Sequence, residues 1–207
     1  MRMPSSAHTS QAWHIHDLTR DFRLEDVWAL PTPGGADDFA RLIEVFAAFD
    51  PARSSSAAVR MLFAIRRQLG ALLGWDAGVP GAGDSSDQPS LRERLPEDLR
   101  PSDVQHQSDL PFTPLYRTER EWAAEIVNRT VHGVVHLGWV PATNGGYRGQ
   151  MAIYVQPKGL LGAAYMTAIR PFRYAIVYPQ ILRDVGRAWR QLGHAPTPAA
   201  AQPSRHT

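Results

Sequence analysis

The chain has 207 residues, of which 43% are hydrophobic, and a formal net charge of +2 at pH 7. This length suits one domain of ordinary size, and the hydrophobic fraction is sufficient for a buried core. The absence of cysteine excludes disulfides, thiolate metal sites and cysteine nucleophiles, and favours an intracellular, cytoplasmic location. The small net charge does not indicate a nucleic-acid-binding protein.

Residues 1–11 are polar and lack the apolar segment of a signal peptide, so we expect a flexible N-terminus. No run approaches the roughly 20 apolar residues of a membrane span, because Arg170 and Arg173 interrupt the best candidate. We therefore predict a soluble protein with a single domain over residues 12–192 and a disordered tail at 193–207.

The first segment of the domain, Trp13–Leu18, is predicted to be a strand with His14 and His16 on one side. Two histidines at this spacing could share a metal ion, with Asp17 as a third ligand. A hydrogen-bonded or solvated pair is the simpler interpretation, and no metal site is predicted.

Three helices are predicted next. Residues 23–30 carry apolar side chains at helical spacing and end before a proline, and an amphipathic helix follows from about residue 37 to residue 49. Residues 54–74 form a further helix, beginning at serine cap candidates and ending at a glycine. The segment 77–109 is rich in Gly, Pro, Ser and Asp, and we expect a loop that is either a lid or disordered.

Order resumes with residues 112–118 and 122–127, the second of which fits a strand or a helix, and two strongly alternating segments follow. Their odd-numbered positions are mainly apolar, whereas their even-numbered positions carry the polar side chains of His132, His136, Arg148 and Tyr154. Pro141 to Gly146 is rich in turn residues. The pattern predicts a β-hairpin with one apolar face.

Antiparallel neighbours must share a face, which places Leu137 opposite Met151 and Val135 opposite Ile153. A direct pairing of residues 140 and 147 would break this rule, so we expect a bulge or an asymmetric loop at the turn.

A helix is predicted beyond Gly159. Leu160 to Ile169 is apolar nearly all the way round, which favours a buried helix, and Pro171 and Pro179 should kink or split it. From residue 182 the helix becomes amphipathic, and we expect it to leave the core at this end.

The basic residues are concentrated near the C-terminus. Between Arg170 and Arg190 there are five arginines and one acidic residue, Asp184. A solvated helix face is the simplest interpretation, and an acidic partner or a membrane surface is the alternative.

No standard catalytic signature is present, and neither a catalytic residue nor a cofactor is predicted. Gly145 to Gly149 lies between two strands rather than before a helix, so it is a turn and not a phosphate loop. Glu125, Asn128, Arg129 and His132 form the densest polar cluster, which fits acid/base chemistry and a structural ion pair equally well.

Several motifs resemble an uncharacterised bacterial family, domain of unknown function twenty-eight sixty-seven, over about Ser6 to Arg190. They are Glu25-Asp26-Val27-Trp28-Ala29-Leu30-Pro31, Leu73-Gly74-Trp75-Asp76, Asn128-Arg129-Thr130-Val131-His132, His136-Leu137-Gly138-Trp139-Val140, Gly146-Tyr147-Arg148-Gly149-Gln150-Met151, Ile169-Arg170-Pro171-Phe172-Arg173 and Ile176-Val177-Tyr178-Pro179. The resemblance implies an α+β fold of the START-like, helix-grip (SRPBCC) superfamily, in which an antiparallel sheet wraps a long C-terminal helix around an apolar cavity. The chain departs from the simplest such fold by two helices and a long loop after the first strand.

Together these features predict a protein that binds a small hydrophobic ligand between the sheet and the C-terminal helix. The predicted ligand-binding residues are Val135, Leu137, Trp139, Met151 and Ile153 of the sheet and Tyr165, Ile169 and Phe172 of the helix. Two alternatives stay open: a filled core made of the same residues, and a cyclase- or hydratase-like enzyme using His132, Tyr154 or Arg148. The sequence does not indicate an oligomeric state.

Overall fold

The structure is a computed structural model that describes residues 1–48, 89–100, 112–127, 131–143 and 145–193. The helix expected over residues 54–74, most of the loop expected over 77–109 and nearly all of the expected tail lie outside these residues.

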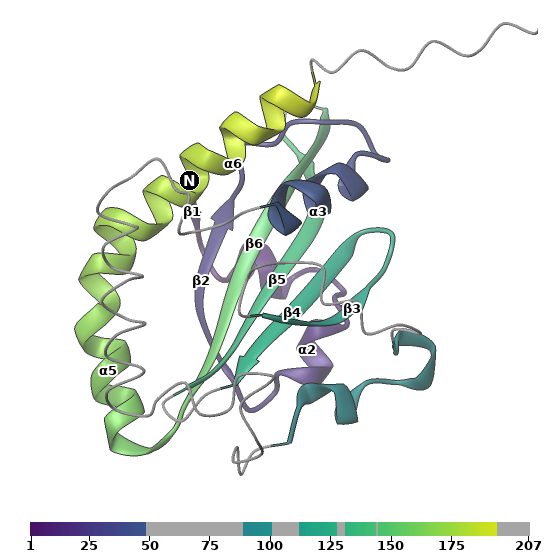
Figure 1. Cartoon of the computed structure of the whole chain (residues 1–207). Helices are drawn as coiled ribbons and strands as arrows, with labels where there is room; N and C mark the ends of the chain where they lie inside the picture. The colour runs from purple at the N-terminus through teal and green to yellow at the C-terminus, as the bar shows by residue number, and fades with distance from the viewer. Residues whose placement is uncertain (49–88, 101–111, 128–130, 144, 194–207) are drawn as a thin grey trace, which may run out of the picture.

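A six-stranded antiparallel sheet forms the centre of the molecule, in the order β1-β2-β6-β5-β4-β3 (Figure 1). Its strands are β1 (Arg2–Met3), β2 (Arg23–Ala29), β3 (Thr113–Arg117), β4 (Glu121–Val127), β5 (Val131–Ala142) and β6 (Gly146–Pro157). The first long strand therefore pairs with the last one, and the α+β class expected from the sequence is confirmed.

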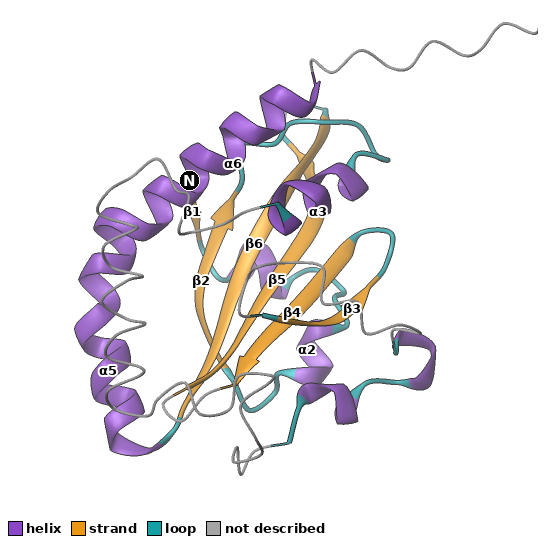
Figure 2. Cartoon of the chain, viewed as in Figure 1, coloured by secondary structure: helices purple, strands orange, loops and turns teal. Residues whose placement is uncertain are grey.

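Helical segments cover both faces of the sheet (Figure 2). One face carries α3 (Phe39–Ala47) and the C-terminal helix, which comprises α5 (Gly159–Phe172), a π-helical turn η4 (Arg173–Val177) and α6 (Tyr178–Gly193). The other face carries short elements, namely α1 (Ser6–Thr9), α2 (Ile15–Leu18) and the 3-10 turns η2 (Leu91–Arg94) and η3 (Glu97–Leu99). We call these the helix face and the N-terminal face.

The register of the central hairpin confirms the predicted pairing. Leu137 lies opposite Met151 and Val135 opposite Ile153. The pairing continues unbroken to Ala142 and Gly146, and no bulge is needed between β5 and β6. A short connection containing Gly145, at a φ of 82° that favours glycine, keeps the two strands in phase.

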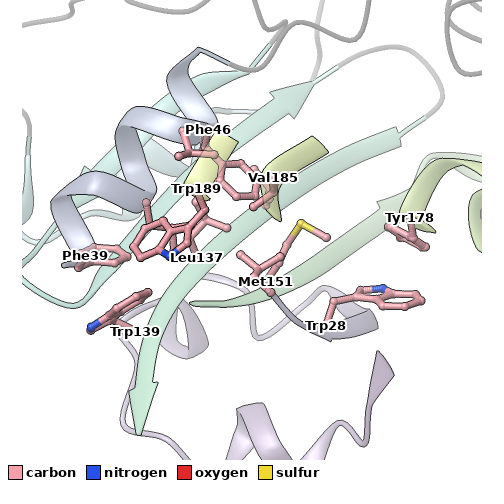
Figure 3. Packing of buried hydrophobic residues seen from close by; sticks show 14 residues of the cluster. Trp28, Phe39, Phe46, Leu137, Trp139, Met151, Tyr178, Val185 and Trp189 are labelled. Atoms are coloured by element: carbon pink, nitrogen blue, oxygen red, sulfur yellow. The ribbon is translucent and has the colours of Figure 1, made fainter. Parts of the chain in front are cut away.

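The core of the helix face is formed where α3 and α6 meet the sheet (Figure 3). Trp139 lies between Phe39 and Trp189, with ring centroids 6.3 and 5.8 Å away, and Trp28 packs against Tyr178 at 4.8 Å. The close approach of these large rings makes this half of the helix face a filled core.

Two local predictions in the first thirty residues are wrong. The segment predicted as strand Trp13–Leu18 ends in the helical turn α2, and the segment predicted as a helix over residues 23–30 is strand β2. A bulge between Leu24 and Asp26 shifts the alternation of β2, and both of its faces are buried at Val27 and Trp28. A strand buried on both faces has no clean period of two, so it is easily mistaken for a helix.

The first eleven residues also differ from the expected flexible N-terminus. Arg2 and Met3 pair with β2, and the side chain of His8 in α1 is fully buried. Backbone pairing and burial hold this segment in place, and polarity alone did not indicate it.

The amphipathic helix expected from residue 37 is present as α3, and the C-terminal helix is split by η4 between the two prolines, as predicted. The burial of the two halves of the C-terminal helix is the reverse of what the sequence predicted. The amphipathic half, α6, buries Val185 and Trp189, whereas the apolar half, α5, leaves Leu160 91% exposed. No helix in the described parts of the chain has the length and apolar content of a membrane span.

The join between the two halves is fixed by Asp26, whose carboxylate is inaccessible to solvent on the helix face of β2. Arg173 donates to Asp26 Oδ2 at 2.5 Å and Tyr178 donates to the same oxygen at 2.8 Å, while the hydroxyl of Tyr174 donates to Oδ1. These bonds attach the start of α6 to the middle of an inner strand.

Replacing Asp26 with Asn is expected to lower the free energy of unfolding by about 3 kcal/mol, because it leaves the buried guanidinium of Arg173 without its counter-ion. The exposed pair of Asp21 with Arg94 supplies the control, and Asp21→Asn should cost less than about 1 kcal/mol. Urea denaturation measures both values. Equal losses would mean that the Asp26 contacts do not anchor the helix.

Candidate functional site

Four of the predicted ligand-binding residues, Val135, Leu137, Trp139 and Met151, lie in the filled core, and Ile153 packs against it. Leu137, Trp139 and Met151 are buried beneath α3 and α6, and the indole of Trp139 donates to the carbonyl of Gly35 at 2.9 Å. Their position is explained by packing between the sheet and these helices.

The predicted residues of the sheet and of α5 differ in burial. Val135 is buried and Ile153 half-buried on the sheet, Ile169 is half-buried on α5, and Phe172 is 50% exposed at the end of this helix. The side chain of Tyr165 is outside the described part of the structure. The structure therefore places the predicted sheet residues in or against the described core, whereas the predicted α5 residues that it describes, Ile169 and Phe172, lie outside it.

The two sides of α5 differ in burial. Gly162 is buried and Met166 and Ile169 are half-buried, and their spacing places them on one side of the helix. The opposite side, which includes Leu160 and Ala164, is exposed. We call these the inner and outer sides of α5. None of the described side chains of α5 belongs to either described hydrophobic core.

The N-terminal face contains a group of polar side chains centred on the buried carboxylate of Glu121 in β4. Four donors reach this carboxylate: His136 Nε2 at 3.0 Å, the hydroxyl of Tyr116 at 2.9 Å, the backbone N–H of His14 at 3.2 Å, and the Nδ1–H of His14. The carboxylate of Glu121 thereby accepts hydrogen bonds from β3, from β5 and from the N-terminal segment. Its environment favours the ionised form.

A second hydrogen-bonded chain runs beside it. Gln150 donates from its amide nitrogen to the carbonyl of Ala7, so its oxygen faces His8 and accepts from Nδ1–H at 2.7 Å. The hydroxyl of Tyr154 lies 2.9 Å from His8 Nε2 and 3.1 Å from His16 Nδ1. The rings of His8 and His136 are 5.0 Å apart, which brings the two groups together into one histidine cluster.

Tyr154 connects two histidines in this hydrogen-bonded chain. The hydroxyl of Tyr154 has one hydrogen, so it donates to one histidine and accepts from the other. His16 Nε2 lies 3.1 Å from the carbonyl of Gln11, so the chain of contacts continues from His8 through Tyr154 and His16 to the backbone.

A separate polar contact joins β4 to the turn η2. Glu125 accepts from His132 Nε2 at 2.7 Å, from the backbone N–H of Leu91 at 3.0 Å and from the hydroxyl of Ser90. Of the polar cluster predicted from the sequence, Glu125 and His132 form this buried contact. Asn128 and Arg129 lie outside the described residues.

Burial and hydrogen bonding shift the pKa values of the cluster in known directions. Burial lowers the pKa of His8 to about 3, and it lowers the pKa of His136 against the opposing effect of Glu121. Burial by itself would raise the pKa of Glu121, but the hydrogen bonds from His136, His14 and Tyr116 outweigh it and lower the pKa to about 2. At neutral pH Glu121 is therefore an ionised carboxylate and His8 is a neutral imidazole.

Burial of its side chains limits the reactions in which this histidine cluster could take part. His14 is its exposed member, with 52% of its side chain accessible, whereas the carboxylate of Glu121 is 4% accessible and its acceptor sites are occupied. His14 and His16 bond to different partners, Glu121 and Tyr154, rather than to a common point. Among the described residues no three histidine, aspartate or glutamate side chains are placed to hold a metal ion.

Sequence reasoning did not identify Glu121, Tyr116, His8 or Gln150 as members of this cluster. Glu121 and Gln150 stand on the same face as His136, and the alternation of β4 and β6 could have paired them once β4 was known to be a strand. His8 carries no such signal, because a four-residue helix outside the sheet brings it in.

The stability of the N-terminal face should depend on pH through His8. Its pKa is lowered from 6.5 to about 3, so the unfolded chain takes up this proton first on acidification. Stabilisation by neutral His8 is complete above pH 6.5 and is lost as the pH falls toward 3. The variant His8→Gln should remove up to about 1.4 kcal/mol per pH unit from the slope of unfolding free energy in this interval.

Urea denaturation between these pH values measures the slope, with Thr9→Gln, an exposed neighbour in α1, as the control that keeps the wild-type slope. Parallel curves for wild type and His8→Gln would contradict a buried neutral histidine.

Comparison with known proteins gives a family but no function. No curated protein and no solved structure matches the chain. The family model described as "Protein of unknown function (DUF2867)" matches residues 18–180 of the 207. This match covers most of the chain, including the central hairpin and α5, and the chain therefore belongs to the DUF2867 family.

Proposed function

We propose that this protein binds a small apolar ligand between the inner side of α5 and the neighbouring part of the sheet. The observation that carries the proposal is the contrast between the two halves of the C-terminal helix. Tyr178, Val185 and Trp189 of α6 are buried in the core, whereas the apolar inner side of α5 is only partly buried and joins neither described core. Apolar surface in this position gains free energy from an apolar partner.

The arrangement of the chain supports a helix-grip, START-like fold as part of the same proposal. Strands β2 and β6 pair, and α6 packs on the face that they share with β5, while α5 continues the same helix beyond β2 (Figure 1). In such folds the space between sheet and final helix holds the ligand, and the resemblance to the family implies this superfamily.

The Asp26 contacts would form the polar end of the site. Tyr174 and Arg173 reach Asp26 from the turn η4, at the point where the helix passes from packed to partly exposed. The ion pair is neutral as a unit, so it suits an uncharged or weakly polar group at one end of an otherwise apolar ligand.

The cyclase- or hydratase-like alternative loses its geometric basis in this arrangement. His132 and Tyr154 project from the N-terminal face, where Glu125 and His8 bind them, and Arg148 on the same face donates to the sulfur of Met3. The sheet separates these groups from α5. Binding without chemistry is therefore the function that the geometry favours for this ligand.

Titration with Nile red, an uncharged apolar dye, and with cis-parinaric acid tests the proposal through the fluorescence increase on transfer to an apolar site. Saturable binding near one molecule per chain is expected. Ile169→Asp on the inner side should weaken it at least about tenfold, because a carboxylate beside an apolar ligand costs more than about 1.4 kcal/mol.

Ala164→Asp is the matched control, since it adds the same charge to the outer side of the same helix and should leave binding unchanged. Thermal unfolding of both variants verifies that they stay folded. The absence of saturable binding by the wild type, or equal losses in the two variants, would show that the inner side of α5 is not the site.

A further inference from the structure

The outer side of the C-terminal helix is a continuous solvent-facing surface that neither the sheet nor the proposed ligand site uses. α5 and α6 follow one another in a single arc along the sheet (Figure 1). On α5 the exposed residues are almost all apolar, and the largest are Leu160, 91% exposed, and Phe172, 50% exposed. The others are Gly159, Ala163, Ala164, Thr167, Ala168, Arg170 and Pro171.

The charge of this arc is strongly one-sided. From Lys158 to Gly193 the chain has six basic residues and one acidic residue, Asp184, a net charge of +5 in a protein whose total is +2. No acidic residue occurs between Lys158 and Arg183. Arg183 is exposed on α6, and Arg170 is exposed near the end of α5.

Exposed apolar side chains followed by exposed arginines on one helical arc are the two elements of an interfacial helix. The apolar residues enter the boundary between headgroups and acyl chains, while the guanidinium groups meet lipid phosphates. We propose that the outer side of α5 and α6 docks on the surface of an anionic lipid bilayer. This inference concerns the opposite side of α5 from the ligand site and does not rest on the proposed function.

Other occupants fit these residues less well. A symmetric pair of chains would place the same arc against itself and bring arginines of like charge together. A nucleic acid would use the arginines but would leave Leu160 and Phe172 in water. An anionic bilayer satisfies both the charge and the apolar side chains.

The full chain is tested by co-sedimentation with vesicles of phosphatidylcholine alone and of equal parts phosphatidylcholine and phosphatidylglycerol. We expect binding to the anionic vesicles, little binding to the zwitterionic ones, and weakening as salt is added. Arg183→Glu should lower the partition coefficient at least roughly fivefold, in line with the contribution of one cation near a charged bilayer. Leu160→Asp should have an effect at least as large.

Two matched controls separate the surface from overall charge. Arg117→Glu makes the same change in net charge on the exposed edge strand β3, and Ala40→Asp adds a carboxylate to the exposed side of α3. Both should bind anionic vesicles as the wild type does, and all four variants should keep its melting temperature.

Equal losses in Arg183→Glu and Arg117→Glu would overturn the proposal, as would equal affinity for the two kinds of vesicle or no binding to either. Light scattering and a duplex DNA titration complete the test. Self-association or DNA binding that depends on Leu160 or Arg183, without binding to vesicles, would assign the surface to a different occupant.

Discussion

The arrangement of this protein depends on one buried carboxylate. Asp26 lies on an inner strand of the sheet without access to solvent. Arg173 and Tyr174 of η4 and Tyr178 at the start of α6 donate hydrogen bonds to its carboxylate. A buried carboxylate without partners would cost several kcal/mol, so these contacts form together with the fold. They determine which half of the C-terminal helix packs on the sheet and which half does not. The packed half closes the core, and the other half carries the two proposed binding surfaces.

The sheet separates two kinds of chemistry. On the helix face the side chains of the hairpin are apolar, and on the N-terminal face they include His132, His136 and Gln150. On that face Glu121 accepts from His136 and Glu125 from His132, whereas the indole N–H of Trp13 and Nδ1 of His136 are buried without a hydrogen-bond partner in the described part of the structure. A polar network of this kind fixes one arrangement of the N-terminal segment over the sheet, because a displaced partner would leave a buried group unsatisfied. Its role is therefore structural, and it makes this layer sensitive to acid.

The two proposed surfaces lie on opposite sides of one helix. The inner side of α5 faces the sheet and is suited to an apolar ligand, and its outer side is suited to a bilayer. Both rest on one apolar helix that joins neither described core, with Leu160 exposed on one side and Ile169 half-buried on the other. An apolar helix left partly in water has a free-energy cost, which a ligand or a lipid surface would remove. A binding role for α5 explains why the chain retains such a segment.

The sequence by itself determined the central hairpin and its register, the division of its faces, helix α3 and the split of the C-terminal helix. Each of these rests on a local signal: a period of two, an amphipathic stripe, or a pair of prolines. The tertiary structure decided the rest. Strand β2 is buried on both faces and has a bulge at Leu24, so it has no readable period. His8 contacts Gln150 and Tyr154, which lie more than a hundred residues away in the chain, and no local pattern encodes these contacts. The choice of α6 rather than α5 as the packed half depends on Asp26, because an apolar stretch favours burial only where another element is placed to cover it.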